Sequence, residues 1–174
     1  MDRTQVLEQL PGLRRYARAL TGDAWAADDL VQDTLERACI KWQLWTVGTN
    51  LRAWLFTLMH NLYLNQRRGQ QVAQHSVSLE DVVLDASTTP TPDIPLDLER
   101  CLQRLPDDQR AVLLLITLED MSYQEAARVL DIPVGTVMSR LSRARTRLRD
   151  LLDGTDTSSP RSAAGAGPVL RRMK

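Results

Sequence analysis

The side chains best suited to chemistry gather on one predicted helix near residue 140. Arginine can donate two hydrogen bonds at once to O6 and N7 of guanine, and small hydroxyl side chains can contact bases or phosphates. Apolar residues recur at spacings of three and four on the opposite face, which predicts that this face is buried. The outer stripe is a candidate surface for reading duplex DNA, although a solvated basic helix in an ordinary bundle has the same pattern. The stripe consists of Thr136, Ser139, Arg140, Arg143 and Arg147.

A shorter predicted helix precedes this one. Ser122 and Glu125 fit a capping box, in which each side chain bonds a free backbone N–H at the start of a helix. Pro133 disfavours a helical conformation for Ile132 and suits the first turn of a new helix. Two helices joined by a tight turn, the second carrying arginines, are typical of a helix-turn-helix that reads the major groove.

A second polar cluster lies near residue 61. Asn61, Asn65 and Arg68 are spaced as one stripe of a helix, with His60 and Arg67 beside them. Amides can bond base edges, cations follow phosphates and aromatic rings stack on bases, so the cluster suits single-stranded nucleic acid. Alternatively, the aromatic residues belong to the core and the amides are solvated. We favour the core for Trp54 and Phe56. For Asn61 both interpretations stay open. Five of the eight aromatic residues lie in or just before this helix: Trp42, Trp45, Trp54, Phe56 and Tyr63.

Helices must position both clusters. Residues 1–70 are predicted to be helical, with Gly22 ending the first helix and Asp23 capping the second, which runs to about Ile40. After a loop, a third helix runs from Leu51 to about Arg68. The second helix carries an acidic outer surface that includes Asp29, Gln32, Asp33 and Glu36.

The rest of the chain divides by composition. Residues 71–95 are rich in Ser, Thr, Pro and Asp and predict a flexible linker, whose irregular stretch starts at Gly69. Residues 96–152 form a second helical unit, in which Pro106, Asp107 and Asp108 mark a helix start. Residues 153–174 predict a disordered tail. The expected fold is all-α, with two small helical domains joined by a flexible linker.

The charge pattern is compatible with DNA binding although the formal net charge is zero. An acidic run precedes Arg100, whereas the segment from Arg140 to Arg149 holds five arginines, so a basic surface and a zero sum coexist. No apolar run approaches the roughly 20 residues that cross a bilayer, and the start of the chain lacks a secretory pattern. These features favour a cytoplasmic location.

The sequence shows no catalytic or metal-binding constellation. His60 and His75 are its two histidines, and Cys39 and Cys101 lack the spacing of a metal site, so both cysteines are expected to be buried. Phosphate loops and nucleophile elbows are also missing. We therefore expect no cofactor and no enzymatic activity.

Taken together, the motifs of both halves resemble those of the extracytoplasmic-function (ECF) group of bacterial RNA polymerase sigma factors. The resemblance covers most of residues 8–152 and leaves out the linker and the tail. It rests on the segments Ala27–Thr34, Leu51–Thr57 with Asn61 after it, Leu105–Arg110, Met121–Ala127 and Pro133–Val137.

The resemblance implies an initiation factor that guides core RNA polymerase to promoters. The first unit would be region 2, whose acidic surface contacts the clamp helices of the largest polymerase subunit. In the same unit, Asn61 would bond an unstacked base of the −10 element, with Asn65, His60, Arg67 and Arg68 nearby. The second unit would be region 4, reading the −35 duplex with the outer stripe described above. An anti-sigma protein is the expected regulatory partner.

Three residues depart from the family pattern. His60 stands where many members have a basic residue, Met138 where lysine is common, and Asp131 at a turn position that is often glycine. These departures affect promoter choice and affinity. Two rival classes fit less well. A dimeric helix-turn-helix regulator would need a dimerisation element, and a resolvase or nuclease would need a nucleophile or a metal cluster.

Overall fold

The computed structural model describes residues 3–45, 50–76 and 96–156. Within these ranges the chain forms seven α-helices and one short 3-10 turn, and it contains no strand, which confirms the expected all-α fold. The first half contributes α1 (Arg3–Thr21), α2 (Ala24–Lys41), the turn η1 (Trp42–Leu44) and α3 (Leu51–Ser76). The second half contributes α4 (Leu96–Gln103), α5 (Asp107–Thr117), α6 (Tyr123–Leu130) and α7 (Val134–Asp156).

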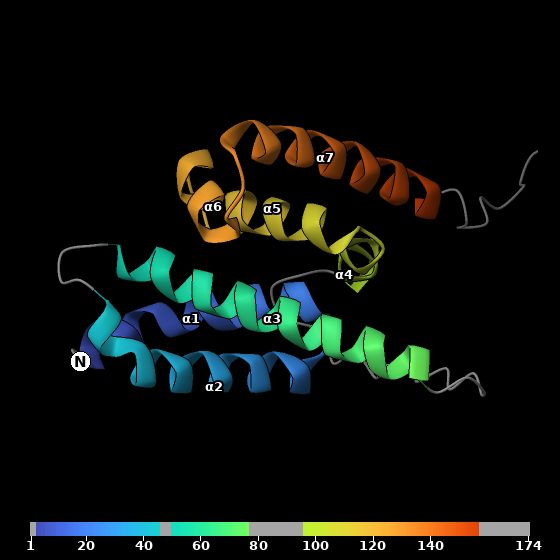
Figure 1. Ribbon diagram of the computed structural model, residues 1–174. Coiled ribbons are helices and arrows are strands. Elements are labelled where there is room, and N and C mark those ends of the chain that lie inside the picture. Colours follow the sequence, from blue (N-terminus) through green and yellow to red (C-terminus); the bar gives the residue numbers. More distant parts are fainter. Residues whose placement is uncertain (1–2, 46–49, 77–95, 157–174) are drawn as a thin grey trace, which may run out of the picture.

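The start of α2 agrees with the sequence prediction. Gly22 adopts a positive φ of 71°, which a residue without a side chain accepts at little cost, and its N–H bonds the carbonyl of Arg18. The side chain of Asp23 then accepts a hydrogen bond of 2.7 Å from the backbone N–H of Ala26. This junction turns the chain so that α2 packs back against α1 (Figure 1).

The third helix is longer than predicted. It passes through Gly69 without interruption and ends at Ser76, so it covers the first six residues of the segment expected to be a linker. A glycine inside a helix costs only about 1 kcal/mol relative to alanine. The neighbours of Gly69 are good helix formers, so the linker prediction is corrected at its start; residues 77–95 lie outside the described residues. The last helix likewise continues to Asp156, slightly past the predicted boundary at 152.

The two halves pack against each other. In Figure 1, α1, α2 and α3 form one layer and the helices of the second half form another above it. The second layer rests on the first through α6 against α3, and through α4 and α5 against α1. One apolar cluster runs through both layers and includes Leu13, Tyr16 and Phe56 from the first half and Val112, Leu115 and Val129 from the second. The sequence predicted two helical domains joined by a flexible linker, and it did not predict that the two domains pack against each other.

The sequence also predicted that two aromatic residues and both cysteines are buried. Phe56 is fully buried and Trp54 is half-buried beside Trp42, which agrees with a core role for both. Cys101 is buried, but Cys39 is exposed, so the expectation of a buried residue was wrong at this position. Among the described helices, none combines the length and hydrophobicity required to cross a bilayer.

Candidate nucleic-acid interface

The outer face of α7 is the first part of the candidate interface. Val137, Leu141 and Ala144 are buried beneath the helix and fix its rotation, so the predicted stripe lies along one flank of α7, next to the buried face at Arg140 and exposed at Arg143 and Arg147. Arg143 and Arg147 are exposed, whereas Thr136 and Ser139 are half-buried. Figure 1 shows α7 on the far side of the second layer from α3, with its outer face uncovered by the described helices.

Arg140, the central arginine of the stripe, has a partner inside its own half. Its Nε lies 3.2 Å from Oδ2 of Asp108, which is itself half exposed. Arg140 is half-buried, but both side chains of this pair keep contact with solvent, and an ion pair open to solvent contributes little free energy. DNA phosphates or bases can therefore replace the carboxylate at small cost. The structure thus places the predicted stripe on one helix face and holds its central guanidinium in position.

The short helix before α7 begins and ends as the capping residues predict. The Ser122 hydroxyl accepts a hydrogen bond of 3.2 Å from the N–H of Glu125, and the Glu125 carboxylate accepts one of 3.0 Å from the N–H of Ser122. The backbone N–H and the hydroxyl of Ser122 both donate to this carboxylate, and these two bonds hold the pKa of Glu125 below its ordinary value. Asp131 then ends α6 in the left-handed region with φ 53°, which explains why glycine suits this position. Capping and turn together set the angle between α6 and α7.

The polar cluster on α3 is divided by the fold. Asn61, Asn65 and Arg68 are exposed and share one stripe of the helix, as expected. His60 is buried beneath the second half, and its pKa falls to about 4, first because burial disfavours the charged ring and second because Arg140 is nearby. His60 therefore does not share the exposed surface with the two asparagines in this arrangement.

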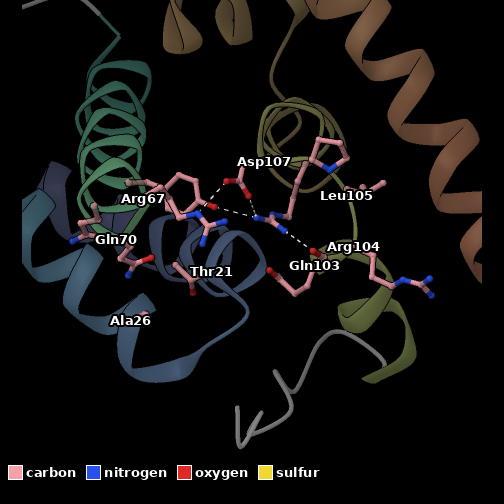
Figure 2. A pocket seen from close by; sticks show the side chains of 12 residues that line it. Thr21, Ala26, Arg67, Gln70, Gln103, Arg104, Leu105 and Asp107 are labelled. Carbon is pink, nitrogen blue, oxygen red and sulfur yellow. Dashed lines mark hydrogen bonds and ion pairs between the residues drawn. The ribbon is translucent and has the colours of Figure 1, made fainter. Parts of the chain in front are cut away.

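Arg67, the remaining member of that cluster, lies at a cleft between the two halves. The cleft measures ≈ 560 Å³ and is lined by α3 on one side and by the chain from Gln103 to Asp107 on the other (Figure 2). Nε of Arg67 lies 3.0 Å from Oδ2 of Asp107. The same carboxylate also pairs with the buried Arg110, whose guanidinium bonds the Tyr63 hydroxyl at 3.0 Å. The cleft is thus bridged by a continuous polar network.

The acidic surface of α2 is largely available for contact. Asp29, Gln32 and Glu36 are exposed, and Gln32 donates a hydrogen bond of 3.2 Å to Glu36. Asp33 is half-buried and accepts a hydrogen bond of 3.2 Å from Gln66 of α3, so it faces the neighbouring helix as well. Figure 1 shows α2 on the opposite side of the molecule from α7.

Sequence reasoning missed two apolar residues on this surface. Trp25 is 86% exposed and Ile40 is 76% exposed. Both fall on the stripe of α2 that holds Asp29, Gln32 and Glu36, because the spacings along it are three and four residues. Trp25 and Ile40 add apolar surface at the two ends of this polar stripe, and aromatic side chains are enriched in protein interfaces. Their helical spacing with the acidic residues was a signal available in the sequence.

The comparisons with known proteins cover both halves. Residues 6–60 match the family described as the Sigma2 domain of PhyR, and residues 96–148 match Sigma-70, region 4. The chain is 37% identical over 165 residues to the ECF RNA polymerase sigma factor EcfG of Rhodopseudomonas palustris, covering 91% of this chain and 90% of the relative.

Solved structures agree with these matches. The sigma factor RpoE of Bartonella quintana, in complex with the anti-sigma factor NepR, has a TM-score of 0.71 and 38% identity, covering 87% of this chain and 96% of RpoE. The anti-anti-sigma factor PhyR of the same organism has a TM-score of 0.59 at 22% identity, over 86% of this chain and 51% of PhyR, and shows the fold alone. With region 2-like and region 4-like halves in order and a relative matched over nearly its whole length, the chain belongs to the ECF sigma factors of RNA polymerase.

Proposed function

We propose that this chain initiates transcription by reading two promoter elements with two different helices. The observation that carries the proposal is the outer face of α7, where exposed Arg143 and Arg147 follow Arg140 on a capped helix-turn-helix. This face suits the major groove of the −35 duplex, where arginine discriminates guanine by about 1–3 kcal/mol per bidentate contact. Thr136 and Ser139 at its start are placed to contact phosphates or base edges.

The second reading surface is α3. Asn61 and Asn65 are exposed, and an amide can bond the Watson–Crick edge of a base that has left the stack. Arg68 on the same stripe suits a phosphate of the unpaired −10 strand. Capture of unpaired bases favours strand opening through binding energy alone, so the chain itself acts as an initiation factor and not as an enzyme.

The polymerase contact is proposed for the outer face of α2. Exposed Asp29, Gln32 and Glu36 supply negative charge and hydrogen bonds, and Trp25 and Ile40 supply apolar area at both ends. This composition fits a helical surface with basic and apolar residues, such as the clamp helices expected from the family. Because α2 and α7 lie on opposite sides of the molecule, polymerase and −35 DNA would not compete for one surface (Figure 1). The site of action would be the cytoplasm, where polymerase works.

A regulatory partner is also proposed. The relative RpoE was solved with the anti-sigma factor NepR, and it is 38% identical to this chain over nearly its full length. We infer that a protein of the same kind holds this chain inactive. Binding of a purified NepR-type protein, measured by calorimetry, should exclude core polymerase in competition.

The match of residues 6–60 to the PhyR family favours one alternative function. PhyR of Bartonella quintana is described as an anti-anti-sigma factor, so a chain with this fold could act only by binding an anti-sigma protein. Sequence identity favours the initiation factor, because this chain is 37% identical to EcfG and only 22% identical to PhyR of Bartonella quintana. The alternative predicts anti-sigma binding without any transcription.

In vitro transcription tests the proposal directly. Purified chain and core RNA polymerase are incubated with fragmented genomic DNA from the source organism, and transcript starts are sequenced. We expect a small set of promoters, weaker use of their −35 elements by Arg140→Ala, and altered −10 preference in Asn61→Ala. Arg128→Ala is the matched control, because this exposed arginine lies on α6 outside the proposed reading stripe. Absence of promoter-specific transcripts would overturn the proposal and favour the PhyR-like alternative.

A further inference from the structure

A polar cleft between the two halves is left unused by the DNA-reading surfaces proposed above. It lies between α3 and the chain that joins α4 to α5, and the corner between α1 and α2 adds Thr21 and Ala26 to its lining (Figure 2). Its volume of ≈ 560 Å³ falls in the range of about 300–1,000 Å³ that is usual for small-molecule sites. Most of its remaining lining residues are arginine or glutamine, so the cleft suits a ligand that is polar and charged.

The charges around the cleft favour an anion. Its lining holds the guanidinium groups of Arg67, Arg104 and Arg110. Asp107 supplies the one carboxylate among the lining residues, so three positive charges minus one negative charge leave an excess of two. Both oxygens of Asp107 are already engaged, Oδ1 by Arg110 and Oδ2 by Nε of Arg67 at 3.0 Å. A partly enclosed site with charges of one sign focuses the electric field and attracts an ion of opposite sign.

Arg67 has hydrogen-bond donors left for a ligand. Only its Nε pairs with Asp107, and its two Nη groups have no partner among the described residues. Figure 2 shows the guanidinium of Arg67 reaching from α3 into the cleft towards Asp107. The side chain is 45% exposed, so a ligand can reach it. The parallel N–H groups of one guanidinium fit two oxygens of a phosphate, which makes Arg67 a candidate phosphate ligand.

Arg104 adds a second set of donors at the rim. Its side chain is exposed and has no partner in the part of the chain that the structure describes. In Figure 2 it extends away from the centre of the cleft. An exposed side chain changes rotamer within nanoseconds, so Arg104 can turn over the mouth of the cleft once an anion is present.

The floor of the cleft carries a hydroxyl that can donate to a ligand. Arg110, which is buried, donates to the Tyr63 hydroxyl at 3.0 Å and to the backbone carbonyls of Leu102 and Gln103. The described residues supply no acceptor for the proton of Tyr63 itself. Burial raises the pKa of Tyr63, and the charge of Arg110 opposes this only in part, so the hydroxyl stays protonated at neutral pH.

Gln103 presents an acceptor that is held in place. Its amide nitrogen donates a hydrogen bond of 3.0 Å to the carbonyl of Ala19. A methyl group at Gly22 would lie 2.5 Å from the amide carbon of Gln103, so the glycine leaves the space that this side chain occupies. Gln66 is fixed in the same way, by donating to Asp33 at 3.2 Å. The oxygens of both glutamine amides remain without a donor among the described residues, and such amides suit the edges of nucleobases.

We propose that this cleft binds a nucleotide. Arg67 and Arg104 take the phosphate groups, and Tyr63 and the amides of Gln66 and Gln103 bond the sugar and the base. Because these side chains are largely positioned before binding, little ordering is needed when the ligand enters. The proposal goes beyond promoter reading, and it gives a role to Arg67, which lies at the cleft and not on the exposed asparagine stripe of α3.

Calorimetry with the purified full chain is the first test. The probes are ATP, ADP, GTP and GDP, with adenosine, guanosine, pyrophosphate and glucose 6-phosphate for comparison, at about 0.15 M salt, where surface charges are screened beyond about 8 Å. At least one nucleotide should bind at least about tenfold more tightly than its nucleoside and than pyrophosphate, which equals about 1.4 kcal/mol. No nucleotide binding at millimolar concentration would overturn the site. Equal affinity for pyrophosphate or glucose 6-phosphate would overturn the nucleotide as its ligand.

Matched variants test which arginines hold the phosphate. Arg67→Ala/Arg104→Ala should weaken nucleotide binding at least about tenfold with unchanged helicity, and Arg67→Lys, which keeps the charge and loses the paired N–H groups, should lie between this variant and wild type. The control Arg143→Ala/Arg147→Ala removes the same charge from the exposed stripe of α7 and should bind as wild type does. An equal loss in the control would place the nucleotide on the DNA-reading face and overturn the cleft.

Nuclear magnetic resonance locates the ligand independently of affinity. On addition of the nucleotide, the side-chain amide signals of Gln66 and Gln103 should shift, whereas that of Gln32, which bonds Glu36 on the outer face of α2, should stay. Shifts confined to α7 would overturn the cleft. Neither measurement uses polymerase or promoter DNA, so a chain that binds a nucleotide here and transcribes from no promoter would overturn the initiation function and leave this site standing.

Discussion

At the scale of single residues, His60 should make the stability of the fold depend on pH. Its pKa is about 4 in the folded chain, against about 6.5 for an exposed histidine, so folding favours the neutral ring. The stability that this difference provides is present above pH about 6.5 and is lost as the pH falls towards 4. Between pH 7 and pH 5 the free energy of unfolding should decrease by about 2 kcal/mol from this group.

Urea unfolding at a series of pH values measures this effect. His60→Gln, which cannot titrate, should have a flatter profile between pH 7 and pH 5 than wild type. The folded-state pKa can also be read from the ring protons by NMR. A ring that titrates near 6.5 in the folded chain would contradict the burial of His60 beneath the second half.

Some residue roles could be predicted from the sequence and others could not. The exposure of Arg143, Arg147 and Asn61 follows from helical periodicity, which is a local property. The two arginines that pair with the buried carboxylate of Glu119 lie 104 and 67 residues away along the chain, and periodicity contains no information about such pairs. Burial of His60 has the same cause, since the second half that covers it is distant in sequence. Long-range packing thus decided the positions of Glu119 and His60, which periodicity could not predict.

At the scale of elements, the capping box fixes the start of α6. Replacing Ser122 with alanine removes the acceptor for the N–H of Glu125 and should lower the free energy of unfolding by about 1 kcal/mol. Ser142→Ala, at an exposed position within α7, is the matched control, and it should be neutral or slightly stabilising because alanine is the better helix former. Equal urea midpoints for the two variants would show that the box contributes nothing.

One exposed position near the start of α7, outside the arginine stripe, lacks the lysine that is common there in the family. Met138 is 50% exposed, and Met138→Lys should add one phosphate contact to duplex DNA. A plot of log affinity against log salt should become steeper by about 0.9, and affinity at low salt should increase. Fluorescence anisotropy with a −35 duplex at several salt concentrations measures both quantities, with Met138→Gln as the uncharged control. An unchanged slope would place residue 138 away from the phosphates.

Element boundaries were predictable where one local signal controlled them. Gly22 and Asp23 at the α1–α2 junction and Ser122 and Glu125 at α6 satisfy free backbone groups within a few residues of themselves. The end of α3 was predicted too early because Gly69 weakens a helix by an amount that the surrounding helix formers offset. A glycine stops a helix only when a turn follows it, and here none does.

At the scale of the whole molecule, the distribution of tryptophan makes the packing of the two halves measurable. All four tryptophans lie in the first half, whereas circular dichroism reports on the helices of both halves. In wild type the buried cluster that joins the halves should couple their unfolding, so both signals should change at the same urea concentration.

In Arg15→Ala/Arg52→Ala the carboxylate of Glu119 loses its partners, and a buried charge without a partner strongly destabilises the packed arrangement of the two halves. The two signals should then separate, with tryptophan fluorescence following the first half alone. Coincident transitions in this variant would mean that apolar packing holds the halves together without the ion pairs of Glu119, whereas separate transitions already in wild type would mean that the halves are independent.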